Sequence, residues 1–220
     1  MLLMLAFAGC GTEAPSESSS SPLPGASADA SDDTLVMCYP SDIGTLNPHT
    51  YEGKMFAQDW LYEGLTAFAD NKVIPSLAES WDISEDGKVY TFHLRKDVVY
   101  SDGTDFNADS AKKNFDAVLL HKDRHSWLES LNQISDVSVI DDHTLQIKLE
   151  NSYYPFLQEM SLIRPVRFCA DAAFPANGDT AEGISQPIGT GMWMLKEHKA
   201  GEYAVFERNE KYWGEKPNFK

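Results

Sequence analysis

Apolar and polar residues alternate in "GKVYTFHLR", residues 87–95. A period of two predicts a β-strand with one buried face. The same alternation runs through "DVSVIDDHTLQIKLE", residues 136–150, on both sides of "DDHT", and it predicts a hairpin. A second hairpin is predicted for residues 191–209, where "GMWMLKEH" and "EYAVFERN" flank a "KAGE" turn.

A helical period appears in "NADSAKKNFDAVLL", residues 107–120. Asn107 is a favourable N-cap residue, and Asp109 in the first turn interacts favourably with the helix dipole. The apolar residues at three- and four-residue spacing form the face that we expect to be buried: Ala111, Phe115, Val118 and Leu119.

Three shorter segments complete the predicted elements. "TLVMCYP", residues 34–40, is rich in β-forming residues and predicts a strand that ends at Pro40. "LNPHTYEGKMFAQDWLYEGLT", residues 46–66, passes from a proline-marked loop into a helix. "SYYPFLQEMSL", residues 152–162, predicts a short helix with Pro155 in its first turn. Together these elements predict an α+β fold.

The N-terminus combines an apolar run with a cysteine. "MLLMLAFAGCG" is shorter than a transmembrane helix, which needs about 20 apolar residues, and "FAGC" is similar to a bacterial lipobox. We therefore interpret residues 1–10 as the remnant of a signal segment whose true start lies upstream, and Cys10 as a lipidation site. Residues 11–33 are rich in Ser, Ala, Pro and Asp and predict a flexible tether. These features indicate an extracytoplasmic protein anchored to the bacterial cell membrane by lipid.

The charge of the chain limits the classes of partner that the protein can bind. Its 34 acidic and 18 basic residues give a formal net charge of −16. Phosphate contacts need clustered basic side chains, so this composition argues against a nucleic-acid-binding protein. The same negative charge opposes attraction to an anionic membrane surface, so attachment to a membrane must be covalent or purely hydrophobic.

Cys38 and Cys169 lie in the part of the chain that is predicted to fold. An oxidising compartment would allow a disulfide between them. We favour two buried free thiols, because cysteine is one of the most frequently buried residue types.

The sequence contains no G-x-S-x-G, H-E-x-x-H, P-loop or C-x-x-C motif, and nothing in it argues for an enzyme. The six histidines are scattered, except that His121 and His125 are four residues apart. This spacing is compatible with a metal site, but the neighbouring Lys122 and Arg124 would repel a bare cation. We therefore expect no direct metal site in these residues.

The arginines say more about the ligand than the histidines do. Arg124, Arg164 and Arg167 occur in segments rich in apolar or aromatic residues. A guanidinium in such a setting can bind a ligand carboxylate in a bidentate manner, or it can form a salt bridge with one of the many acidic residues. If residues 121–130 form a helix, Arg124 and Trp127 lie on the same face.

Three blocks of the sequence occur together in a known family. They are "IPSLAESWDISEDGKVYTFHLRKDVVYSDGTDFNADSAKKNF" (74–115), "PIGTG" (187–191) and "RNEKYWG" (208–214). In content and order they resemble the peptide/nickel class of substrate-binding proteins of ABC importers, solute-binding protein family 5. The resemblance covers nearly all of residues 34–220.

This resemblance implies a mixed α/β, two-lobed fold that closes on its ligand at a hinge. The chain would be a fragment that contains the first lobe, with the second lobe missing. Residues 34–72 and 184–220 would form one incomplete subdomain, and residues 73–183 an inserted second one.

Four segments are most similar to the nickel-binding branch of the family: "LNPHTYEGKMFAQ", "DRHSWLESLNQI", "SYYPFLQEM" and "RPVRF". The resemblance implies that Arg124 and Arg164 contact the carboxylates of a small chelator that surrounds the metal. It also implies that Tyr51, Met55 and Trp127 line the pocket.

His125 is expected to be a bystander or to support the pocket from behind, since the histidine that contacts the metal in the nickel-binding branch lies beyond these residues. An arginine-lined pocket favours a neutral or negative chelate over a bare divalent ion. The implied function is capture of a nickel(II) chelate, for instance with histidine, by a monomeric receptor that delivers it to the subunits of an ABC permease. The alternatives are a receptor for dipeptides, oligopeptides or another metallophore, and a ligand sensor.

Overall fold

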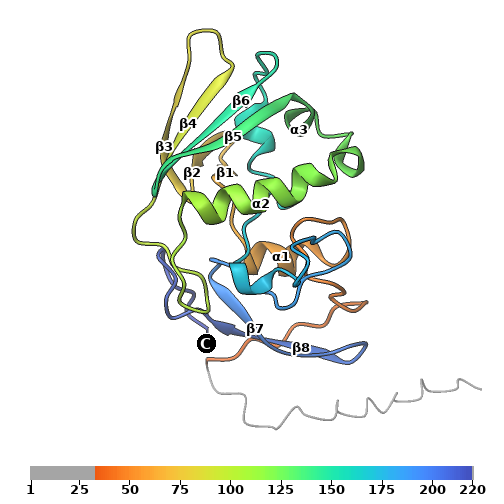
Figure 1. Ribbon diagram of the computed structural model, residues 1–220. Coiled ribbons are helices and arrows are strands. Elements are labelled where there is room, and N and C mark those ends of the chain that lie inside the picture. The colour runs from red at the N-terminus through yellow and green to blue at the C-terminus, as the bar shows by residue number, and fades with distance from the viewer. Residues whose placement is uncertain (1–32, 220) are drawn as a thin grey trace, which may run out of the picture.

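The computed structural model describes residues 33–219, which form a mixed fold of helices and antiparallel sheets (Figure 1). The α+β class expected from the sequence is confirmed. The predicted signal segment, the lipidation site Cys10 and the tether apart from Asp33 lie outside the described residues. None of the helices in residues 33–219 has the length and apolar character needed to cross a bilayer.

The largest sheet in the described residues is antiparallel throughout, with strand order β3, β4, β6, β5. Its strands are β3 (Ala78–Ile83), β4 (Val89–Leu94), β5 (Ile134–Asp141) and β6 (Thr144–Leu149).

Two sequence predictions concern this sheet, and both are confirmed. The alternating residues of β4, Tyr90, Phe92 and Leu94, are buried as expected. β5 and β6 form the predicted hairpin, with Val137 opposite Ile147 on the buried face.

The helix α2 (Ala108–Leu120) packs on β5 and β6 and lies across one face of the sheet (Figure 1). Its N-terminus is a capping box: the Asn107 side chain accepts from the Ser110 N–H at 2.9 Å, and Ser110 Oγ accepts from the Asn107 N–H at 3.2 Å. The predicted cap is therefore confirmed. The predicted inner face is buried, fully or in part: Ala111, Phe115, Val118 and Leu119.

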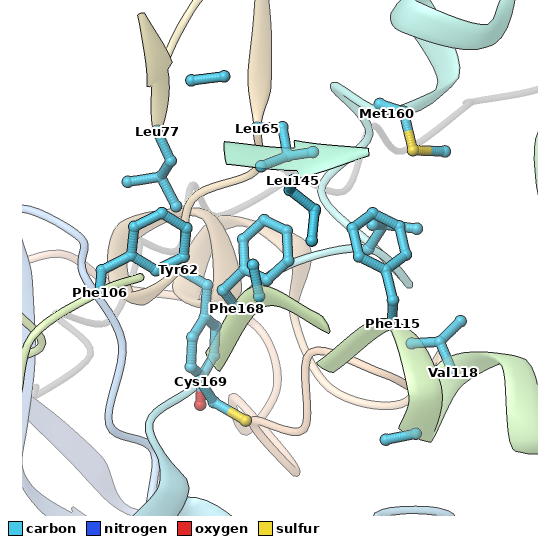
Figure 2. Packing of buried hydrophobic residues seen from close by; sticks show 14 of the residues in the cluster. Tyr62, Leu65, Leu77, Phe106, Phe115, Val118, Leu145, Met160, Phe168 and Cys169 are labelled. Atoms are coloured by element: carbon cyan, nitrogen blue, oxygen red, sulfur yellow. The ribbon is translucent and has the colours of Figure 1, made fainter. Parts of the chain in front are cut away.

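Aromatic side chains form the centre of the core. Phe168 lies between Phe106 and Phe115 (Figure 2), with ring centroids 5.5 Å and 5.7 Å away. All three rings are buried. Because Phe115 belongs to α2, this packing holds Phe168 and the chain around it against that helix.

The second part of the molecule contains α1 (Met55–Leu61) and a hairpin of β7 (Trp193–Lys199) and β8 (Tyr203–Arg208), below the large sheet in Figure 1. Trp60 of α1 packs edge-on against Phe206 of β8, with ring centroids 5.2 Å apart. The predicted helix and hairpin are confirmed. The division of the chain into two subdomains stays a prediction.

Short elements connect these parts. Pro155 is the N-cap of α4, one position before the first turn, so the predicted short helix is confirmed with a shifted start. The connecting elements are β1 (Thr66–Ala69), β2 (Lys72–Pro75), the 3₁₀ turn η1 (Lys122–His125), α3 (Glu129–Gln133), α4 (Phe156–Glu159) and the 3₁₀ turn η2 (Asp171–Ala173).

The predicted strand at residues 34–40 is wrong. Residues 35–39 form no ladder with any strand in the part of the chain that the structure describes. Leu35, Val36 and Met37 are 58%, 69% and 55% exposed. A strand needs a neighbouring strand to satisfy its backbone groups, so β-rich composition alone does not determine this segment.

A continuous helix over residues 121–130 is also not observed. α2 ends at Leu120, the turn η1 follows, and Trp127 lies in the irregular segment before α3. In this turn Lys122 Nζ donates to the carbonyl oxygens of Asn132 and Ile134 at 2.9 Å and 3.3 Å, and these bonds connect η1 to the end of α3. Helical spacing therefore does not relate Arg124 to Trp127.

The two cysteines of the folded part are free thiols. Cys169 is buried, as predicted, whereas Cys38 is exposed, contrary to the prediction. The exposure of Cys38 has the same cause as that of its neighbours, since residues 35–39 pack in no sheet of the described structure.

Buried polar side chains join the N-terminal segment to α2. Asn114 exchanges two hydrogen bonds with the backbone of Cys169: Nδ2 donates to the carbonyl oxygen and Oδ1 accepts from the N–H, both at 2.9 Å. His49 Nε2 lies 3.0 Å from Asn114 Oδ1 and 3.2 Å from the carbonyl oxygen of Arg167. His49 Nδ1 lies 2.9 Å from Thr180 Oγ1.

These partners determine the protonation state of His49. Both neighbours of Nε2 are acceptors, so Nε2 carries the hydrogen and Nδ1 accepts from the hydroxyl of Thr180. His49 is 2% exposed, and burial lowers its pKa to about 4. The native state therefore contains His49 as the neutral imidazole.

We predict that His49→Gln removes part of the acid sensitivity of the fold. The unfolded chain binds a proton at this residue near pH 6.5, whereas the native state does so only near pH 4. Between these values the unfolded state binds more protons, so lowering the pH from 7 to 5 should reduce the free energy of unfolding by about 2 kcal/mol through His49. Denaturant unfolding at the two pH values should show a loss smaller by this amount in the variant.

His93→Gln is the control for this prediction. The His93 side chain is 40% exposed on β4 and pairs with Asp82. The same measurements on this variant give the change that results from replacing a partly exposed histidine, and the change in His49→Gln should differ from it. An unchanged pH dependence in the His49→Gln protein would contradict the assignment of His49 as the buried neutral group.

Candidate ligand-binding site

Several residues implied by the family resemblance meet at Tyr51. Its hydroxyl lies 2.7 Å from His125 Nδ1 and accepts a hydrogen bond from Trp127 Nε1 at 2.8 Å. The ring centroids of Tyr51 and Trp127 are 5.8 Å apart. The guanidinium carbon of Arg164 lies 6.0 Å from the centroid of the Tyr51 ring. Tyr51, Trp127 and Arg164 therefore form one group, with His125 as a buried partner of Tyr51.

The hydrogen bonds in this group have a defined direction. The indole N–H can only donate, so the oxygen of Tyr51 accepts from it and its own proton points to His125 Nδ1. That nitrogen must then be unprotonated. His125 is 1% exposed; burial, followed by the charges of Arg124 and His121, lowers its pKa to about 4. A neutral His125 therefore orients the phenol.

Trp127 is 61% exposed although its N–H is bonded to Tyr51. An exposed ring normally rotates freely, and holding it in place in advance lowers the entropy lost when a ligand stacks on it. The side chain thus offers a flat, oriented contact surface.

Arg164 is held by the loop that follows Tyr51. Its Nη1 donates to the carbonyl oxygens of Glu52 and Gly53, at 3.1 Å and 3.4 Å. Gly53 has a φ of +78°, and a Cβ there would lie 1.8 Å from the carbonyl oxygen of Thr45. Only glycine permits this turn, so the residue type at this position determines where the two carbonyl groups point.

Arg124 lies in the turn η1, and its Nη1 donates to the carbonyl oxygen of Ala181 at 3.0 Å. Ala181 belongs to a loop that is distant in sequence. As for Arg164, the partner is a neutral backbone group.

The other three arginines have carboxylate partners. Their ion pairs are Arg95 with Asp97 (3.1 Å), Arg167 with Asp59 (3.4 Å) and Arg208 with Glu210 (2.6 Å). Arg124 and Arg164 form no ion pair within residues 33–219. The positive charges of these two side chains are therefore available to an anionic ligand.

Arg167, the third arginine considered from the sequence, has a structural role. It is buried and donates to the carbonyl oxygens of Leu162, Tyr62 and Ser161. These bonds, together with the ion pair to Asp59, engage its guanidinium inside the fold.

The positive charges of Arg124 and Arg164 influence the pKa of Tyr51. Burial raises the pKa of the Tyr51 hydroxyl, and the hydrogen bond from Trp127 and the positive charges of Arg164 and Arg124 oppose this rise. The structure thus brings Tyr51, Trp127 and Arg164 together, and Arg124 lies next to His125, the hydrogen-bond partner of Tyr51. Met55 is 47% exposed at the start of α1, and its place in a pocket stays a prediction.

The histidine pair noted in the sequence faces two different ways. His121 Nε2 lies 2.8 Å from Asp179 Oδ1, whereas His125 Nδ1 lies at Tyr51. Within the described residues there is no group of three or more His, Cys, Asp or Glu side chains suited to hold a metal ion.

Sequence reasoning missed the partners that hold the site residues. The acceptors for Arg124 and Arg164 are backbone carbonyl groups, which carry no side-chain signal. The bond from Tyr51 to His125 was missed as well, since the two residues are far apart in the chain. The one available signal was the position of His125 between Arg124 and Trp127 in "RHSW".

Comparison with known proteins gives a consistent result. Residues 72–220 match the family model of bacterial extracellular solute-binding proteins, family 5 (middle). The nickel-binding periplasmic protein of Escherichia coli (strain K12) is 52% identical over 193 residues, which cover 87% of this chain and 37% of that protein. These matches confirm the resemblance inferred from the sequence blocks.

Two solved structures share the fold. NikA from Brucella suis, in complex with Fe(III)-EDTA, matches with a TM-score of 0.81 and 49% identity over 83% of this chain and 37% of that one. NikZ from Campylobacter jejuni, in complex with Ni(L-His), matches with a TM-score of 0.69 and 31% identity over 80% of this chain and 35% of that one. The chain thus spans little more than a third of the length of these proteins.

We predict that Tyr51→Phe releases the Trp127 side chain. The change removes the acceptor of the indole N–H and the proton donor to the buried His125 Nδ1, and we expect a loss of about 1–2 kcal/mol in the free energy of unfolding. In ¹⁵N NMR spectra the indole signal of Trp127 should move towards the position of a free exposed tryptophan. Tyr203→Phe, which removes an exposed hydroxyl bonded to Glu197, is the control and should change the stability by less than about 0.5 kcal/mol. An indole signal that stays at its wild-type position would contradict the proposed orientation.

Proposed function

Because the chain belongs to family 5 of the bacterial extracellular solute-binding proteins, we propose that its protein captures a nickel(II) complex of a small carboxylate-bearing chelator, such as histidine, and delivers it to an ABC permease. The observation that carries this proposal is the pair Arg124 and Arg164. Neither has a carboxylate partner in the described residues. Arg164 lies 6.0 Å from the centroid of the Tyr51 ring, and Arg124 precedes His125, which is hydrogen-bonded to Tyr51.

The charge of the site favours a chelate over a bare ion. Two guanidinium groups repel a hydrated divalent cation. A complex whose donors include carboxylates is neutral or negative and presents oxygen atoms to those groups. In the proposed complex Arg124 and Arg164 bind the carboxylates, while Trp127 and Tyr51 contact the flat or apolar parts of the chelator.

The names of the relatives support nickel chelates as the cargo. One relative is a nickel-binding protein, and one structural neighbour holds Ni(L-His). A second neighbour holds Fe(III)-EDTA, in which the metal is again enclosed by a carboxylate-bearing molecule. The shared property of these two ligands is a metal whose charge is covered by organic anions.

We further propose an extracytoplasmic, lipid-anchored and monomeric receptor. The apolar run that ends at Cys10 supports lipidation of that residue, and the composition of residues 11–33 supports a tether between the lipid and the folded part. The permease subunits in the membrane are the expected protein partners.

Binding of nickel should require histidine. Calorimetric titration of the complete gene product with nickel plus histidine should give tight binding, and titration with nickel alone should give weak binding or none, because the two arginines repel the uncovered ion. A mixture of short peptides is the third titrant. A response to peptides with none to nickel plus histidine would show that the cargo is wrong, while membership of the family would be unaffected.

Arg164→Ala should weaken binding of nickel plus histidine by about 2–4 kcal/mol, because the ligand carboxylate loses its charged partner. The measurement is the Kd from the same titration. Lys196→Ala is the matched control, since it also removes one positive charge, from a side chain that is 61% exposed and pairs with Glu207. Equal affinities in the two variant proteins would exclude Arg164 from the site.

A further inference from the structure

Four hydrogen bonds link Arg124, Ala181, Asp179 and His121 in a closed ring. The backbone N–H of Arg124 donates to the carbonyl oxygen of His121 at 2.9 Å, and Arg124 Nη1 donates to that of Ala181 at 3.0 Å. The Ala181 N–H donates to Asp179 Oδ1 at 2.8 Å. His121 Nε2 donates to the same carboxylate oxygen, also at 2.8 Å, since an ionised carboxylate can only accept.

The loop that contains Asp179 and Ala181 is anchored in the core between them. Thr180 is 1% exposed. Its carbonyl oxygen accepts from Asn47 Nδ2 at 2.6 Å, and its hydroxyl bonds to His49 Nδ1 at 2.9 Å. The Ala181 carbonyl is therefore fixed both by the core and by the Asp179 carboxylate.

We infer that Asp179 is a positioning residue for the proposed chelate site: it holds His121 and the Ala181 N–H so that the Ala181 carbonyl oxygen faces one N–H of Arg124. The remaining guanidinium N–H groups have no hydrogen-bond partner within residues 33–219. They are left for the carboxylate of the ligand. This inference rests on the proposed function, and it adds a residue that does not itself touch the ligand.

Asp179 acts on Arg124 mainly through the loop, because the two side chains form no ion pair. Asp179 pairs instead with His121. The Ala181 N–H, followed by His121 and by the more distant charge of Arg124, lowers the pKa of the Asp179 carboxyl, so the carboxylate is ionised and holds both donors at neutral pH. Each bond in the ring orients the next, and a closed ring of this kind is more rigid than one isolated contact.

The first test is independent of any ligand. In a crystal structure of the Asp179→Ala variant of the complete gene product, the Ala181 N–H and His121 lack their common acceptor. We expect Arg124 Nη1 to lie beyond hydrogen-bond distance of the Ala181 carbonyl oxygen. A guanidinium that remains on Ala181 would overturn the inference, whatever the protein binds.

The second test is a double-mutant cycle on the Kd for nickel plus histidine. Asp179→Ala should weaken binding by about 3- to 30-fold in the wild-type background and by less than about 2-fold in the Arg124→Ala background, because Asp179 acts through that side chain. Equal losses in both backgrounds would show a general structural effect and overturn the inference. If the wild-type protein does not bind nickel plus histidine, the proposed function fails, and the crystal structure alone decides the positioning role.

Two further variants separate geometry from charge. Asp179→Asn keeps an acceptor oxygen for the Ala181 N–H and for His121, and we expect it to restore the affinity to within about 3-fold of wild type. Asp116→Ala removes one negative charge from an exposed pair with Lys112 on α2, and it should leave the Kd unchanged. A loss in the Asp116→Ala protein equal to that in Asp179→Ala would assign the effect to net charge and would also overturn the inference.

Discussion

The hydrogen bonds of His49 and Asn114 join three segments that are distant in the sequence. Asn114 binds the backbone of Cys169 in both directions, and His49 connects Asn114 to Thr180. Each of these polar groups is buried, and an unpaired donor or acceptor at such a place costs about 1–3 kcal/mol. The segments can therefore pack only in the one arrangement that satisfies all of them. Since Tyr51 follows His49 by two residues, this arrangement also places Tyr51.

The candidate site inherits its geometry from that arrangement. α2 carries Asn114 and ends just before the turn that contains Arg124 and His125. The position of α2 therefore determines where His125 lies when it bonds to the Tyr51 hydroxyl. Thr180 fixes a second loop, whose Ala181 carbonyl oxygen accepts from Arg124. The oriented surface of the site is thus built from the turn after α2 and two loops, and the core network determines their positions.

Local patterns predicted the regular elements but not the connections between them. The strand β4, the capping box at Asn107 and the β5–β6 hairpin were predictable because period and capping chemistry act within a few residues. Residues 34–40 were predicted as a strand from composition, and that failed because a strand depends on a partner that composition does not reveal. The clustering of Tyr51, Trp127, Arg124 and Arg164 was implied by family resemblance and by no spacing in the chain. The backbone acceptors of the two arginines were beyond reach, since every residue type supplies the same carbonyl group.

The choice of those acceptors is informative in a chain with so many acidic residues. With 34 acidic and 18 basic residues, an arginine near the surface readily meets a carboxylate, as Arg95 and Arg208 do. Such an ion pair neutralises the guanidinium, and an anionic ligand would first have to displace the resident carboxylate. A carbonyl oxygen instead fixes the direction of the side chain and leaves its other N–H groups without a bound carboxylate. The fold therefore supplies orientation without competition at Arg124 and Arg164, and binding of a carboxylate there loses little freedom and breaks no existing ion pair.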